Sequence, residues 1–394
     1  MSPSFQTLFF NITALILFGI AVFAFMRPEL YARAPIEPVA MSSQAAGAGA
    51  ASSSPITVAS TTPVATSTPP KKTPAKKAPV SAPSPSIAVS LSTPPPDKNQ
   101  ALRIQNPYTF SPLEFPAVNE LVRSTLVNIL CISKGESLRS VTGSGVIIDP
   151  RGVILTNAHV AQYILLSKIE GAALSCIIRT GSPAVSRWRA EILYIPPVWV
   201  DAHAADITSR HALGTGEHDY ALLRIVDSLD GSPLSISLPF LPIDTRDAIG
   251  FEADHVLAAS YPAELSAGSA QDSFYAASTV TTIKQLLTFD INSVDLVALG
   301  GIIEAQSGSS GGAVVNAWGR LISIIVTTSE GKTTGDRNLH ALTLSYINRD
   351  FTKQTGHTLS DLLSGDIASV AENFNTNIAP NLIAIYLQQL SSNH

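Results

Sequence analysis

The sequence has few charged residues and few cysteines. Only 14% of its 394 residues are charged, and the formal net charge of −5 is spread without a long acidic or basic block. This excludes the basic patch by which nucleic-acid-binding proteins are recognised. The two cysteines, Cys131 and Cys176, stand in no C-x-x-C spacing, which argues against a structural zinc site, and we expect no cofactor. Low charge with 45% hydrophobic residues favours β-structure around a well-filled core.

An apolar segment without charges, residues 8–26, lies near the N-terminus. About 20 apolar residues span a bilayer as a helix. A buried core helix is the alternative, but nothing downstream offers it a partner. No Lys or Arg precedes the segment, and the best cleavage site, Ala32-Arg33-Ala34, is followed by Pro35. We therefore expect residues 1–27 to be an uncleaved transmembrane anchor rather than a signal peptide.

The composition changes twice beyond this segment. Residues 28–112 are rich in Pro, Ala, Ser, Thr and Lys, which predicts a disordered stalk. In residues 113–350, short β-branched runs alternate with Gly, Pro, Asp and Ser, as is typical of an all-β barrel or sandwich. We expect one helix near 116–123, where a proline suits the first turn. Residues 351–394 carry apolar faces at helical spacing and predict a helical tail.

The stretch QSGSSGGA, residues 306–313, is of a composition that is usual in flexible linkers. The alternative is that Ser310 is a nucleophile. Gly308 would let its own N–H and that of Ser310 point to one spot, while Gly311 and Gly312 keep side chains away from a substrate. An apolar run, AVVN, follows, which a linker would not need. A serine nucleophile requires a base to take its proton.

Two further residues complete a candidate catalytic set. His159, in GVILTNAHVA, follows a turn and an expected strand; a lone histidine beside apolar residues is more often structural. Asp219, in HDYALLRIV, precedes an apolar run, where burying an unpartnered carboxylate is costly. The alternative is a solvated carboxylate at a strand start. An imidazole oriented by a buried carboxylate is the usual base for a serine.

Together, TGSGVIID…GVILTNAHV, HDYALLRI and SGSSGGAVVN, in the chain order His, Asp, Ser, resemble the chymotrypsin-like serine peptidases, above all their disulfide-poor Deg/Htr-type branch. The resemblance covers about residues 121–348. It implies two perpendicular six-stranded antiparallel β-barrels with the active site in the cleft between them. It also implies that His159 is the general base, Asp219 orients it and Ser310 attacks. The N–H groups of Gly308 and Ser310 would form the oxyanion hole. No segment of PDZ size follows, although that branch usually has one.

The sequence departs from this family at several positions. Ser309 stands where Asp or Asn is common, so pairing with a freed N-terminus is not expected. Val326 stands where digestive relatives have serine at the start of the substrate strand. Glu304 lies six residues before Ser310, where trypsin-like enzymes hold the acid that selects Lys or Arg. It is either a pocket carboxylate or, as most charged residues are, a solvated one on the loop rim. Thr327 and Thr328 would line the substrate strand, and Thr328, if it stands where digestive enzymes have glycine, would narrow the pocket and favour small or aliphatic side chains.

Two other features leave alternatives open. The connection 196–218 is longer than a barrel needs and contains several histidines and aspartates, but their spacing matches no familiar metal site, so we interpret it as a surface loop. The residues concerned are Asp201, His203, Asp206, His211 and His218. Cys131 and Cys176 fall on separate expected strands, where a disulfide and two buried thiols are equally compatible with the sequence.

The leading hypothesis is a membrane-anchored serine endopeptidase that hydrolyses polypeptide substrates. The alternatives are a catalytically inactive peptidase-like binding or scaffold protein of the cell envelope, and a stalked structural protein. Arg27 and Arg33, counted alone, favour a cytoplasmic C-terminus. The stalk composition and a hydrolytic activity favour the opposite orientation, so we expect a single-pass protein with an extracytoplasmic peptidase. Its oligomeric state is not indicated by the sequence.

Overall fold

The computed structural model describes residues 106–392, except 136–137, 170, 172, 210–214, 236, 248, 264–273, 291 and 329–332, and the side chains of 327, 328, 334 and 392. The predicted anchor (1–27) and most of the predicted stalk (28–112) therefore lie outside the described residues. Within the described part of the chain, no helix is long and apolar enough to cross a membrane.

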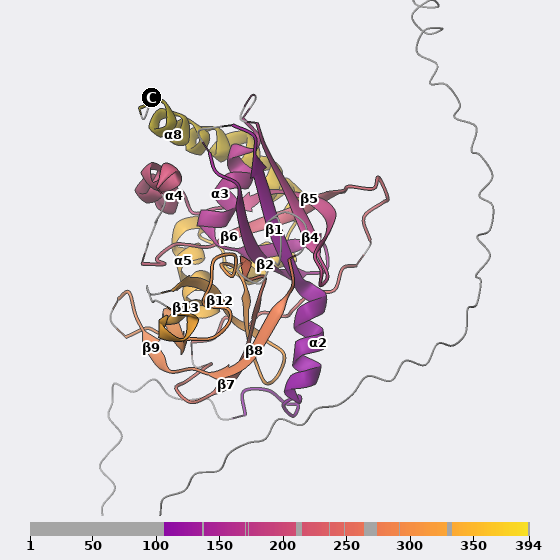
Figure 1. Cartoon of the computed structure of the whole chain (residues 1–394), viewed down its shortest axis with the longest axis vertical. Helices are drawn as coiled ribbons and strands as arrows, with labels where there is room; N and C mark the ends of the chain where they lie inside the picture. Colours follow the sequence, from indigo (N-terminus) through magenta and orange to yellow (C-terminus); the bar gives the residue numbers. More distant parts are fainter. Residues whose placement is uncertain are drawn as a thin grey trace, which may run out of the picture. The chain divides into compact units, whose positions relative to one another are not determined.

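The first half of the described chain forms a closed six-stranded antiparallel barrel (Figure 1). Its strand order is β1-β2-β3-β6-β5-β4, and it closes because β1 pairs with both β2 and β4. The apolar side chains of these strands fill the interior of the barrel. Ile129, Ile154 and Leu223, for example, are fully buried. The strands are β1 (Leu126–Ser133), β2 (Val141–Asp149), β3 (Val153–Thr156), β4 (Leu174–Thr180), β5 (Val185–Tyr194) and β6 (Ala221–Ser228). This confirms the first predicted barrel.

The second half forms a seven-stranded sheet, so the prediction of a second closed six-stranded barrel is wrong. The sheet order is β8-β7-β11-β12-β13-β10-β9, with consecutive strands β8 and β9 at its two edges. The backbone N–H of Ile283 donates to Asp254 O next to β7, and that of Lys284 donates to Ala298 O in β10. The segment thus bends from one edge to the other. The strands are β7 (His255–Ser260), β8 (Ala277–Thr282), β9 (Gln285–Leu287), β10 (Leu296–Gly300), β11 (Ala313–Asn316), β12 (Leu321–Thr328) and β13 (Leu339–Thr343).

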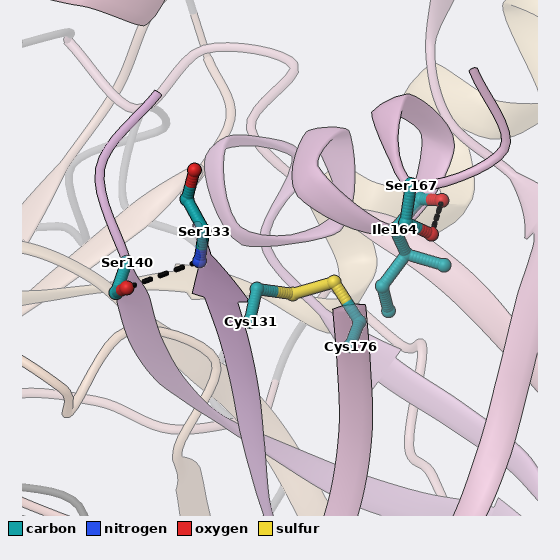
Figure 2. Close-up of a disulfide and its surroundings, with 6 residues drawn as sticks. All are labelled: Cys131, Ser133, Ser140, Ile164, Ser167 and Cys176. Atoms are coloured by element: carbon teal, nitrogen blue, oxygen red, sulfur yellow. Dashed lines mark hydrogen bonds between the residues drawn. A yellow bond between two sulfur atoms is a disulfide. The ribbon is translucent and has the colours of Figure 1, made fainter. Parts of the chain in front are cut away.

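Cys131 and Cys176 form a disulfide between β1 and β4 (Figure 2). They are directly opposite each other in the antiparallel register of the two strands. This settles the choice between a disulfide and two thiols. The bond joins the two strands whose pairing closes the barrel.

Helices cover the barrel and the second sheet on several sides. The predicted helix near 116–123 is confirmed as α2 (Phe115–Thr125), which packs against strands of both sheets. The predicted helical tail is also present, but α5 already begins at Leu344, because Thr343 caps it by accepting from the N–H of Tyr346. The other helices are α3 (Ala158–Leu166), α4 (Pro197–His203), η1 (Ala204–Thr208), η3 (Thr334–Asp336), α5 (Leu344–Thr355), α6 (Leu359–Ser364), α7 (Ile367–Asn373), η4 (Phe374–Ile378) and α8 (Ala379–Ser392).

Candidate active site

The structure brings His159 and Asp219 together. His159 lies in the first turn of α3, just after β3, and Asp219 lies just before β6, which pairs with β3. The Asp219 carboxylate accepts two hydrogen bonds from His159. Oδ2 lies 2.7 Å from the ring Nδ1, and Oδ1 lies 3.0 Å from the backbone nitrogen. Asn157 Nδ2 also donates to Asp219 O at 2.8 Å. The Asp219 side chain is nearly buried, so the solvated alternative is wrong.

Asp219 raises the pKa of the His159 imidazole. Burial alone would lower the pKa of His159, but the negative charge of Asp219 and the hydrogen bond to it raise this pKa above its ordinary value. Because Nδ1 faces a carboxylate, it carries the proton in the neutral ring. Nε2 is then left as the acceptor, which is the tautomer a general base requires.

The loop that carries Ser310 comes from the second sheet but is held by Ser144 of β2. Ser144 N–H donates to Ser310 O at 2.7 Å, and its Oγ donates to Gly308 O at 2.8 Å. The same Oγ accepts from the N–H of Tyr261 at 2.9 Å. Gly311 adopts a left-handed φ of 83°, and a Cβ there would lie 2.1 Å from Ser144 O. Only glycine permits this close approach of the two sheets.

The backbone around Ser310 leaves two donors unused. Gly308 has a φ of 87°, and a Cβ there would lie 2.6 Å from Tyr261 O. Among the described residues, the N–H groups of Gly308 and Ser310 have no acceptor. Their carbonyl groups are both occupied by Ser144. This arrangement can stabilise an oxyanion at Ser310.

Ser310, His159 and Asp219 line one cleft of about 450 Å³. Both sheets contribute to it, with Thr142 and Tyr163 on the barrel side and Ile325 and Val326 on the other. A third wall comes from the connection 196–218, which we had interpreted as a surface loop. That interpretation is wrong, because its helices α4 and η1 place three side chains in the cleft. They are Trp199, His203 and Asp206.

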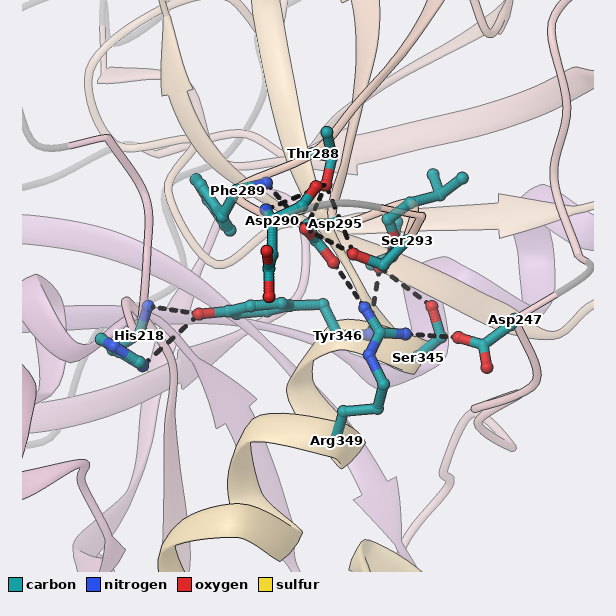
Figure 3. A network of polar contacts seen from close by, with 12 residues as sticks. His218, Asp247, Thr288, Phe289, Asp290, Ser293, Asp295, Ser345, Tyr346 and Arg349 are labelled. Atoms are coloured by element: carbon teal, nitrogen blue, oxygen red, sulfur yellow. Dashed lines mark hydrogen bonds and ion pairs between the residues drawn. The ribbon is translucent and has the colours of Figure 1, made fainter. Parts of the chain in front are cut away.

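The two described histidines of this connection, His203 and His218, face different partners. His203 Nδ1 lies 3.1 Å from Asp206 Oδ2, and its ring stacks on Trp199. His218 instead faces α5, where its N–H donates to the Tyr346 hydroxyl (Figure 3) and its Nδ1 lies 2.9 Å from Asp350 Oδ1. No metal-holding group of three such side chains occurs among the described residues, which do not include His211. His218 has a left-handed φ of 59°, so its contacts to α5 fix the backbone directly before Asp219.

One family of known proteins matches the part of the chain that contains this cleft. A family model described as "Trypsin-like peptidase domain" matches residues 143–324, which include His159, Asp219 and Ser310. Residues 143–324 therefore form a trypsin-like peptidase domain, which identifies the chain as a serine endopeptidase. One solved structure, a serine endoprotease from Yersinia pestis, is 23% identical, with 62% of this chain and 68% of that chain covered and a TM-score of 0.39. No curated protein matches this chain.

Glu304 of this trypsin-like domain is fully buried, so the interpretation as a solvated rim carboxylate is wrong. Its Oε1 accepts from Thr279 Oγ1 at 3.0 Å, and its Oε2 has no partner. Burial raises the pKa of Glu304 to about 7. Among the described residues it does not line the cleft. The side chains of Thr327 and Thr328 lie outside the described part, so their predicted role stays a prediction.

Two neighbours of the site were missed because their roles depend on distant residues. Ser144 sits in an ordinary GSG strand motif, and nothing local reveals that it reaches residues 308 and 310. Gln162, on α3, lines the cleft and donates from Nε2 to His159 O at 2.8 Å. Its helical spacing of three residues from His159 was the available signal.

The buried Glu304 predicts a pH-dependent stability. The folded chain keeps this proton up to about pH 7, whereas the unfolded chain loses it near pH 4.5. The free energy of unfolding should therefore fall as pH rises from 4.5 to 7 and level off above that. Glu304→Gln removes this pH dependence. Between pH 4.5 and 7, the free energy of unfolding of the variant should therefore rise by roughly 3 kcal/mol relative to that of the native chain. Urea unfolding of both chains between pH 4 and 8 measures the difference, and parallel curves would contradict the prediction.

Proposed function

We propose that this chain hydrolyses peptide bonds through His159, Asp219 and Ser310. His159 Nε2 takes the hydroxyl proton as Ser310 Oγ attacks the substrate carbonyl, and an acyl-enzyme forms as the protonated imidazole gives that proton to the leaving amine. Water then attacks the acyl group by the same proton path. The observation that carries the proposal is the 2.7 Å contact between His159 Nδ1 and Asp219 Oδ2, in a cleft that also contains Ser310.

The oxyanion of each tetrahedral intermediate would be bound by the N–H groups of Gly308 and Ser310. Their lack of an acceptor in the described chain supports this role. Donors that are already oriented stabilise the developing charge without reorganisation. Ser144 fixes the orientation of these N–H groups, because it donates hydrogen bonds to the carbonyl groups of the same two residues.

The second candidate is a catalytically inactive binding or scaffold protein of the cell envelope on the same fold. A cleft lined by Trp199 and Tyr163 would suit a bound peptide in either case. The paired His159 and Asp219 favour the enzyme, because a buried carboxylate is costly to keep for binding alone.

The proposed setting is the membrane, with residues 1–27 as anchor, 28–112 as stalk, 113–350 as peptidase and 351–394 as helical tail. The apolar segment 8–26 supports the anchor. The disulfide between Cys131 and Cys176 supports an extracytoplasmic peptidase, because disulfides persist mainly in oxidising compartments. Proposed partners are polypeptide substrates and the membrane, with no nucleic acid and no cofactor.

Labelling with a fluorophosphonate probe tests the nucleophile. Native protein should be labelled at Ser310, and Ser310→Ala should lose both labelling and peptide hydrolysis, by a factor on the order of 10⁶ in kcat. Ser309→Ala is the matched control, since Ser309 Oγ is buried and bonded to Ser260 rather than open to the cleft. Hydrolysis that survives in Ser310→Ala would mean that the nucleophile is misassigned. Absence of labelling in the native protein would favour the scaffold.

The pH profile tests Asp219. The native rate should fall in acid with an apparent pKa above the ordinary histidine value of about 6.5, because the base must be neutral. Asp219→Asn should lower kcat about 10⁴-fold. It should also move the acid limb of the rate profile to lower pH. Without the Asp219 charge, burial lowers the pKa of His159 and nothing offsets it. Asp206→Asn is the control. An equal loss there, with Asp219→Asn active, would identify the other carboxylate.

Cleavage-site preference tests the pocket residues. We expect kcat/KM to be higher for Ala or Val than for Arg before the cleaved bond, because Thr328 would narrow the pocket that Thr327 also lines. Glu304 is buried, and its raised pKa keeps it neutral below about pH 7. It would select Lys or Arg only if its carboxylate reached the substrate. Profiling with a peptide library measures the ratio. A dominant Arg preference that disappears in Glu304→Gln would reverse this expectation.

Detergent phase partition tests the anchor. Full-length protein should enter the detergent phase, and a chain starting at Pro107 should stay in the aqueous phase and remain active. Mass spectrometry of the cellular protein gives its N-terminus. A chain that lacks residues 1–34 and stays in the aqueous phase would show cleavage and contradict the anchor.

A further inference from the structure

The C-terminal helix α8 lies against the part of the barrel that carries His159. It packs on α3, which begins next to His159, and on α4 and η1, which form a wall of the cleft (Figure 1). Leu382 and Tyr386 of α8 are buried in the same core cluster as Trp199 of α4 and Ile164 of α3. The helix therefore contacts two of the elements that shape the cleft, although its own residues do not line it.

A continuous pair of hydrogen bonds connects α8 to His159. The Tyr386 hydroxyl donates to Gln162 Oε1 at 3.0 Å, and Gln162 Nε2 donates to His159 O at 2.8 Å. The direction is fixed chemically. A backbone carbonyl only accepts, so the amide nitrogen must face His159, and the amide oxygen must then face the phenol.

The surroundings keep this connection intact. Tyr386 is fully buried and Gln162 nearly so, and the bond between their side chains is shielded from water. Burial raises the pKa of Tyr386 well above its usual range, and the nearby Tyr163 and Asp219 add to the effect. The phenol therefore stays a donor over the whole pH range in which His159 titrates.

We infer that Tyr386 is a positioning residue that holds His159 in its working place through Gln162. The inference rests on the proposed role of His159 as the base. Asp219 holds the backbone N–H of His159, and Gln162 holds its carbonyl, so the residue is fixed from both sides. Without the phenol hydroxyl, the Gln162 amide oxygen is buried without a donor, and the amide is free to turn away from His159. The ring then sits less firmly against Asp219.

The test uses the full-length chain and a fluorophosphonate, whose reaction rate with Ser310 does not depend on the unknown substrate. Tyr386→Phe keeps the ring and removes only the hydroxyl. Tyr194→Phe is the matched control, because it loses a similar bond, from its hydroxyl to Gln354 Oε1 at 3.1 Å, and neither of these residues lines the cleft. We expect Tyr386→Phe to label about tenfold more slowly, since small misplacements of a base are costly. Its acid limb should move to lower pH, because Asp219 raises the pKa of a loosened ring less.

Tyr194→Phe should keep the native rate and profile with a comparable loss of thermal stability. The final labelled fraction should stay complete in both variants, which separates slow chemistry from unfolding. In a Gln162→Leu background, Tyr386→Phe should have no further effect on the rate.

Three results would overturn the inference. These are a native rate and profile in Tyr386→Phe, a loss confined to the labelled fraction, and an undiminished effect of Tyr386→Phe in the Gln162→Leu background. Labelling that persists in Ser310→Ala would instead overturn the proposed function, and the inference with it. The two failures are therefore distinguishable.

Discussion

The contact of Ser144 with the loop around Ser310 is the interaction on which the site depends. Ser144 belongs to the first barrel and donates to the carbonyl groups of Gly308 and Ser310, which lie in the loop before β11 of the second sheet. Because Ser144 is fully buried, losing one of these bonds leaves an unsatisfied polar group, which costs about 1–3 kcal/mol. The absence of a Cβ at Gly311 makes the approach possible. The hydrogen bonds that join the barrel to the second sheet are thus also the ones that position the loop of Ser310.

The buried carboxylates differ in what faces them. Asp219 faces the imidazole and backbone N–H of His159, and Asp350 faces His218 and the Tyr220 hydroxyl. Glu304 has a single partner, Thr279, and burial raises its pKa to about 7. With this one donor only, burial favours the neutral form of Glu304. Only the paired carboxylate at the cleft suits the orientation of a base.

Elements outside the two sheets complete the cleft. The connection between β5 and β6 forms α4 and η1 and supplies one wall, and α8 packs against both. The barrel and the second sheet position the reacting groups, while these helices form part of the surrounding wall. A residue as distant in sequence as Tyr386 is in this way connected to His159 through a single amide.

The sequence alone determined the β-rich class, helix α2 and the candidate residues His159, Asp219 and Ser310, because strand periodicity and glycine-bounded motifs are local signals. The first barrel was implied by the resemblance to a known family. It missed β5, whose outward Arg187 and Arg189 break the apolar pattern, and the short β9 and β10. Only the tertiary structure decided the seven-stranded second sheet, the disulfide, the burial of Glu304 and the contacts of Ser144 and Tyr386. Each of these depends on residues far apart in the chain, and no local pattern encodes which distant partner a buried polar group will meet.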